Sequence, residues 1–161
     1  MTRHIALMGR TIVAVGVAAT LLMGTAVTAS ASRKVASTSS QASARAKIIT
    51  DWQAFFSGRT PADRKVQLVQ DGPQFAPVIK AQASSPLAKS TAAKVSKVTL
   101  ARTAKTAVVV YSVTLGGKTA LAGQKGEAVL LGGTWKVGAE SFCTLLKLEG
   151  TAPPICKALA K

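Results

Sequence analysis

The sequence predicts an α+β fold in which N-terminal helices and a short C-terminal helix pack on a curved antiparallel sheet of about four strands. Apolar side chains recur at helical spacing between residues 47 and 83, whereas beyond Pro86 they alternate and β-branched residues dominate. Helical spacing then returns after Ser141. Because helices and strands are segregated along the chain, the class is α+β, with the helices on one face of the sheet.

The first 31 residues have the pattern of a secretory signal. A short basic stretch ends at Arg10, and the uncharged, largely apolar run Thr11–Val27 follows it. Small residues at Ala29 and Ala31 predict cleavage before Ser32, and Val27–Ala29 offers a second candidate site. No Arg-Arg pair precedes the run and no Cys follows it, which indicates Sec export without a lipid anchor.

An uncleaved membrane anchor is the alternative to this signal. Thr11–Ala29 is 19 residues long, close to the roughly 20 that cross a bilayer. Arg33 and Lys34 would then lie on the outer side, which the positive-inside rule disfavours. We therefore expect a secreted or cell-wall-associated protein with no membrane span after cleavage.

The mature chain is predicted to hold a leader and one domain. Residues 32–46 contain five serines and no aromatic side chain, too polar a composition to be buried, so they are predicted to be a disordered Ser/Ala-rich leader. Residues 47–161 form the single α+β domain. Removing 31 of the 161 residues leaves 130, a common size for one domain with one core.

Three helices are predicted before Pro86. The first ends at a left-handed Gly58. The second is capped by Thr60, starts at Pro61 with Asp63 in its first turn, and stops before Gly72. The third is the weakest, because a proline falls near its start. The first and third are expected at residues 46–57 and 75–83.

Alternating residues then predict the strands. Thr106–Leu115 places Ala107, Val109, Tyr111, Val113 and Leu115 on one side and is nearly all apolar, which is typical of a central strand. A Gly-Gly pair is expected to turn the chain before the last strand. The Gly-rich stretch at 118–126 is predicted to be a loop or a broken edge. The other strands are expected at residues 94–102, 126–131 and 134–138.

The C-terminal region is predicted to be a helix tied to the tail by a disulfide. Ser141 can cap a helix that runs through Leu148 and ends at Gly150. Cys143 and Cys156 are the only two cysteines, and an even count in an exported chain indicates one structural bridge. A redox pair is the alternative, but the Cys-x-x-Cys spacing is absent.

The order and spacing of five segments match a known family: Thr60–Lys65, Leu68–Gly72, Ala107–Leu115, Gly132–Val137 and Ser141–Leu146. On these segments the chain resembles the secreted low-molecular-weight antigen family of mycobacteria and related actinobacteria, over about residues 47–156. This family's C-terminal domain is similar to the nuclear transport factor-like cone fold. The resemblance implies an exported, non-enzymatic envelope or extracellular protein, and it supplies no catalytic residues. Some members lack the cysteine pair, so the bridge is a subfamily feature.

Charge is the strongest global signal. Without Arg3 and Arg10, 19 basic residues oppose six acidic ones, so the formal net charge of the mature chain is +13. Outside the cell this charge favours anionic wall polymers or an envelope protein as partners, or serves only to keep the protein soluble. The lysines form no run and no stripe with aromatic residues, which disfavours nucleic acid.

The residue types argue against catalysis. His4, the only histidine, lies in the signal, so the mature chain has no imidazole for a proton shuttle or a metal. The carboxylates, expected to be solvated, are Asp51, Asp63, Asp71, Glu127, Glu140 and Glu149. We therefore expect no enzyme, no cofactor and no metal.

Six aromatic residues are the candidates for a pocket lining, and core packing is the favoured interpretation. The leading hypothesis is a non-catalytic module that binds a surface or a partner. The alternatives are a small-ligand-binding or enzymatic member of the cone superfamily and an anchored accessory subunit of a membrane complex. The six residues are Trp52, Phe55, Phe56, Phe75, Tyr111 and Trp135.

Overall fold

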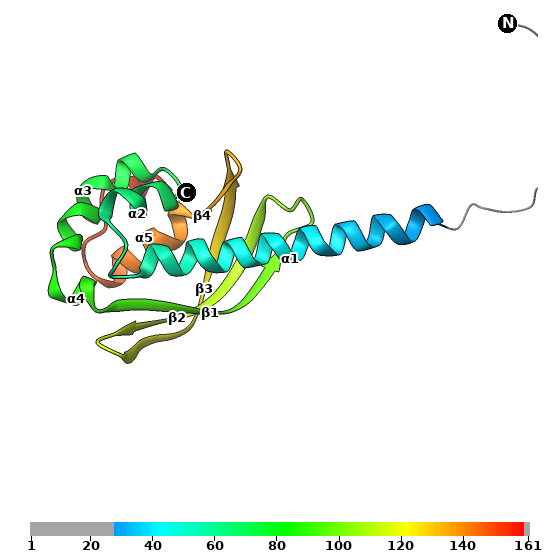
Figure 1. Cartoon of the computed structure of the whole chain (residues 1–161). Helices are drawn as coiled ribbons and strands as arrows, with labels where there is room; N and C mark the ends of the chain where they lie inside the picture. Colours follow the sequence, from blue (N-terminus) through cyan, green and yellow to red (C-terminus); the bar gives the residue numbers. More distant parts are fainter. Residues whose placement is uncertain (1–27, 160–161) are drawn as a thin grey trace, which may run out of the picture.

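The computed structural model describes residues 28–159 and confirms the α+β class. Helices come first, a four-stranded antiparallel sheet follows, and short helices close the chain (Figure 1). The predicted signal, apart from residues 28–31, lies outside the described residues. The helices are α1 (Thr28–Phe56), α2 (Ala62–Leu68), α3 (Gly72–Ala83), α4 (Pro86–Lys89), α5 (Ala139–Leu148) and α6 (Ile155–Ala158). The strands are β1 (Thr91–Leu100), β2 (Thr106–Leu115), β3 (Lys118–Leu131) and β4 (Thr134–Val137).

The sheet is open, with the strand order β1-β2-β3-β4, so β2 is an interior strand as predicted. Its alternation is also confirmed. Val109 and Tyr111 are buried, whereas Val108 on the opposite face is 49% exposed. The helices therefore cover one face of the sheet and leave the other to solvent.

Of the two alternatives predicted for residues 118–126, the loop is wrong, because these residues form the first half of β3. The broken edge fits, because this half pairs with β2 alone and its register is interrupted. Val113 pairs with Leu121 and Tyr111 pairs with Gln124 across the β2–β3 ladder. The extra residues are absorbed by two register shifts and by Gly123, whose φ of +61° is accessible to glycine at little cost. Pairing with a strongly apolar neighbour thus overrides the weak local propensity of a Gly-rich segment.

Helix α1 is much longer than predicted. The predicted disorder over residues 32–46 is wrong, because the structure continues the helix from Thr28 through this segment (Figure 1). No Gly or Pro occurs between Gly24 and Gly58, so nothing in the sequence interrupts the backbone hydrogen bonds. Polar composition predicted correctly that residues 37–43 are exposed, but exposure does not prevent helix formation.

At two glycines that border helices, the backbone of another residue lies too close to leave room for a side chain. Gly58 is not left-handed as predicted; instead a Cβ there would lie 2.2 Å from the carbonyl oxygen of Lys89. Gly72 starts α3 rather than ending a helix, and a Cβ there would lie 1.8 Å from the carbonyl oxygen of Val66. Thr60 does not cap α2, whose N-cap position is Pro61. Gly150, with φ +71°, does follow α5 as predicted.

The core lies between α1, α3, α5 and the inner face of the sheet. All six predicted aromatic residues are buried there. Ring contacts run from Tyr111 through Trp52 and Phe56 to Phe55, with Tyr111 and Trp52 centroids 5.1 Å apart, and Phe142 then joins Phe55 and Phe75 to the same cluster. Such contacts stabilise a small core beyond area burial alone. The core interpretation of these residues therefore holds in the structure.

Candidate functional site

An open pocket of about 430 Å³ lies beside this core. Its volume is within the usual range for small-ligand sites. Phe55 and Phe56 of the aromatic cluster form part of its floor, so two of the six candidate residues serve both core and pocket. The other apolar lining residues are Ile79, Ala83, Leu87, Ala88, Val113, Leu115, Ala120, Leu121, Phe142, Leu145 and Leu148.

The apolar surface continues out to solvent. Leu87 is 59% exposed and Leu148 is 66% exposed, and both line the pocket. Large apolar side chains are rarely grouped at an open cavity unless something covers them. This surface was not predictable from the sequence, because the lining residues come from elements distant along the chain.

Few polar groups interrupt this wall. Lys65 of α2 is half-buried, and burial lowers the pKa of its ammonium group. Glu149 is exposed, and its Oε2 accepts a hydrogen bond of 2.6 Å from Nε2 of Gln82. Glu149 is the one carboxylate among the residues that line the pocket, so no second acid is present there to share a proton.

A second, shallower groove of about 380 Å³ lies between α1, α2 and the β3–β4 turn. Asp51 lines it, and burial raises the pKa of this carboxyl group, while Arg64 and Lys47 act in the opposite direction. Asp51 is half-buried, whereas the other five predicted carboxylates are exposed as expected. Trp135 also lines this groove, although its side chain is only 4% exposed.

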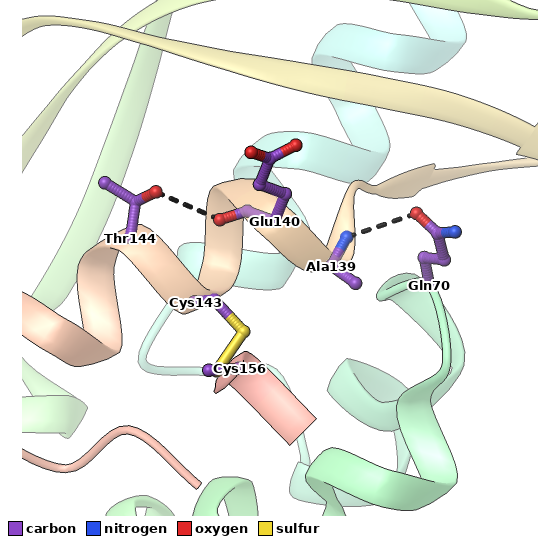
Figure 2. The surroundings of a disulfide bond; sticks show 6 residues. All are labelled: Gln70, Ala139, Glu140, Cys143, Thr144 and Cys156. Carbon is purple, nitrogen blue, oxygen red and sulfur yellow. Dashed lines mark hydrogen bonds between the residues drawn. A yellow bond between two sulfur atoms is a disulfide. The ribbon is translucent and has the colours of Figure 1, made fainter. Parts of the chain in front are cut away.

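The predicted disulfide is confirmed and ties α5 to the tail. Cys143 and Cys156 are bonded and buried (Figure 2). The tail contains the short helix α6, in which Cys156 lies. No free cysteine occurs in the part of the chain that the structure describes.

The N-terminus of α5 is held from outside the helix. The backbone N–H of Ala139 donates to Oε1 of Gln70 at 3.2 Å, which Figure 2 shows beside the disulfide. Ser141, the predicted cap, instead accepts a 2.7 Å hydrogen bond from the backbone N–H of Glu127 on β3. Sequence reasoning missed Gln70 because it lies 69 residues away. These contacts fix α5, and with it the pocket wall that α5 supplies.

The uncovered face of the sheet is basic. We define the basic sheet face as Lys94, Lys97, Lys125 and Lys136 with the residues between them. Val110 of β2 pairs with Lys97 on one side and Lys125 on the other, which places these two lysines on the same face. Lys94 pairs with Ser112, and Lys136 with Val129, in the same outward set. Glu127, opposite Val108, is an acidic side chain on this face.

Within residues 28–159, no group of three or more His, Cys, Asp or Glu side chains is placed to hold a metal ion. No helix of that range is long and apolar enough to cross a membrane. Among the described residues, Trp52 Nε1 is a buried donor without a hydrogen-bond partner. The Trp52 ring lies in the packed core, with Cη2 and Cζ2 close to Gly126, and not in the pocket lining.

The fold and the site define a disulfide-stabilised α+β domain with one apolar pocket and one basic sheet face. The chain matches the family described as the low molecular weight antigen MTB12, C-terminal domain, over residues 40–153, and it belongs to this family. This confirms the antigen family that the sequence resembles. No curated protein and no solved structure matches the chain. Family membership and the disulfide together indicate an extracellular protein.

Proposed function

We propose that this protein is an exported, non-catalytic binding protein of the cell envelope and that its pocket takes a small apolar ligand. The observation that carries the proposal is the open pocket of about 430 Å³ with an apolar wall and exposed leucines at its edge. Burial of a ligand would remove this wall from water, at roughly 25 cal/mol for each Å² of apolar surface. A preformed concave site of this kind is where proteins commonly bind small molecules.

The residues around the pocket support binding rather than reaction. General acid–base catalysis needs positioned groups that exchange a proton with the substrate. The described lining offers one exposed carboxylate, Glu149, and one ammonium group, Lys65, and it has no imidazole. A non-catalytic binding role therefore explains the lining residues, and it requires no additional proton-exchanging group.

A neutral fluorescent probe, Nile red, tests the pocket directly. We expect saturable binding of one probe per chain, with increased emission. Ala83→Phe places a large side chain in the pocket wall and should weaken binding by about tenfold or more, a loss of roughly 1.4 kcal/mol. Ala81→Phe is the matched control, because Ala81 is exposed on the same helix and does not line the pocket. Equal binding by both variants, or no binding by the unchanged protein, refutes the pocket proposal.

Adhesion to an anionic wall polymer is the second candidate function, favoured by the basic sheet face. Four lysines from three strands share one solvent-exposed surface there. Long-range attraction of this kind is screened over about 10 Å at 0.1 M salt. Retention on purified cell wall should therefore fall as salt rises.

Removal of selected charges tests whether the basic sheet face itself, and not the net charge of the whole protein, causes retention on the cell wall. Replacing Lys97 and Lys125 by Gln should reduce retention more than replacing Lys89 and Lys157, which are exposed outside the face. Retention that does not respond to salt, or that falls equally in both double variants, rules out the basic sheet face as the adhesive surface.

A further inference from the structure

The pocket contains one cation that no acidic group neutralises. Lys65 lines the pocket and is half-buried, and within the described residues it lies in no ion pair. By contrast, Lys80 on the neighbouring helix α3 is paired with Asp63 at 3.1 Å. Removing an ammonium group from water without a partner costs free energy, and the lowered pKa of Lys65 reflects this cost. An anionic group that entered the pocket would relieve it.

The other residues that line the pocket are mostly apolar and favour a ligand that is itself largely apolar. Phe55, Ile79, Val113 and Leu145 line the pocket and are themselves nearly or fully buried. The exposed Leu87 and Leu148 extend the same surface outward. A ligand that fits both features has a charged end and a flexible apolar chain.

We propose, building on the proposed binding function, that the ligand is a single-chain fatty carboxylate, whose headgroup pairs with the Lys65 ammonium group while its alkyl chain covers the apolar wall. Charge complementarity selects the head, and the shape and composition of the pocket select the tail. A carboxylate carries one negative charge, which matches the one ammonium group among the described residues of the pocket lining.

Of helix α1, only the C-terminal end reaches the pocket. Phe55 and Phe56 line the pocket at the C-terminal end of α1, and Thr28 starts the same helix 27 residues earlier. At 1.5 Å per residue, the helix carries its start about 40 Å from the pocket. Figure 1 shows this N-terminal part of α1 projecting away from the other helices.

Glu149 opposes the binding of an anionic ligand. Its carboxylate lines the same pocket and would repel an anionic head, so it lowers the affinity that Lys65 provides. Gln82 holds this carboxylate through the hydrogen bond of 2.6 Å. Glu149→Gln removes the charge and keeps a side chain of the same shape, so it should tighten fatty carboxylate binding several-fold. Glu140→Gln, on the exposed first turn of α5, should leave the affinity unchanged.

Titration calorimetry with dodecanoate and dodecanol on the delipidated mature protein tests the inference. Dodecanoate should bind about tenfold or more tightly than dodecanol, as expected when a charge-assisted contact is added. Affinity should rise about fourfold for each methylene added to shorter carboxylates, until the pocket is filled. Lys65→Met should abolish the preference for the carboxylate while leaving dodecanol binding intact, and Lys65→Arg should restore it.

The control and the outcomes separate this inference from the proposed function. Lys97→Met on the basic sheet face should keep the full preference for dodecanoate. Equal affinity for acid and alcohol, or no effect of Lys65→Met, overturns the fatty carboxylate and leaves the apolar pocket standing. Absence of binding by either ligand and by Nile red overturns both. A loss of both ligands in Lys65→Met with an unchanged melting temperature also contradicts the assigned headgroup contact.

Discussion

Reduction of the Cys143–Cys156 bridge should destabilise the domain by an amount that the loop length sets. The two cysteines are 13 residues apart. The chain-entropy relation for a loop of this length gives about 3 kcal/mol. For a domain of this size, 1 kcal/mol corresponds to about 4 °C in melting temperature, so reduction should lower it by roughly 12 °C.

The structure adds a local consequence to this estimate. Besides the bridge, the tail is held by Ile155 and Leu159, which pack against the core beside the buried Cys156. Reduction should therefore open the tail before the rest of the domain unfolds. Limited proteolysis should then cut near the Pro153-Pro154 pair at a much higher rate.

Thermal unfolding followed by circular dichroism, with and without reductant, measures the effect. The Cys143→Ala/Cys156→Ala double variant is the control, because its melting temperature should not respond to reductant. A shift of less than about 3 °C in the unchanged protein, with reduction verified by thiol titration, would show that the bridge adds little and that tail packing alone holds the C-terminus.

Three further predictions concern other parts of the chain. A Cβ at position 126 would lie 2.8 Å from Cη2 of the buried Trp52. Gly126→Ala should therefore lower the free energy of unfolding in urea by about 1–3 kcal/mol and alter the near-ultraviolet circular dichroism of the tryptophan. An unchanged urea midpoint would contradict this packing. Burial raises the pKa of Tyr111 from 10.0 to about 12. Its neutral form is thus favoured in the folded state, and stability should fall by about 3 kcal/mol between these two pH values. Tyr111→Phe should remove that part of the slope, and because this is the only tyrosine, its absorbance titration reports the shift directly. Intact mass should place the mature N-terminus at Ser32 and show the cysteines oxidised, whereas an intact Met1 would instead favour the anchored alternative.

Local sequence pattern predicted the fold class and the interior strand well. Thr106–Leu115 is predicted and observed with the same bounds, because ten residues of strong β propensity leave no competing conformation. The disulfide was equally predictable from two cysteines in a chain that is predicted to be exported. By contrast, the first half of β3 was predicted only as a loop or a broken edge, and the helix through residues 32–46 was missed. The first half of β3 forms a strand because it pairs with β2, which a local pattern does not show. Residues 32–46 were predicted to be disordered from their polar composition, although the segment contains no residue that breaks a helix.

What the sequence alone determined, therefore, is the α+β class, the interior strand, the aromatic core and the disulfide, since periodicity and residue type encode them locally. Only the tertiary structure brought Lys65 into the apolar wall and placed Gln70 at the start of α5. It also showed that Gly58 is needed for a close approach to the Lys89 carbonyl. These relations join residues distant along the chain, and their geometry exists only after the helices have packed on the sheet.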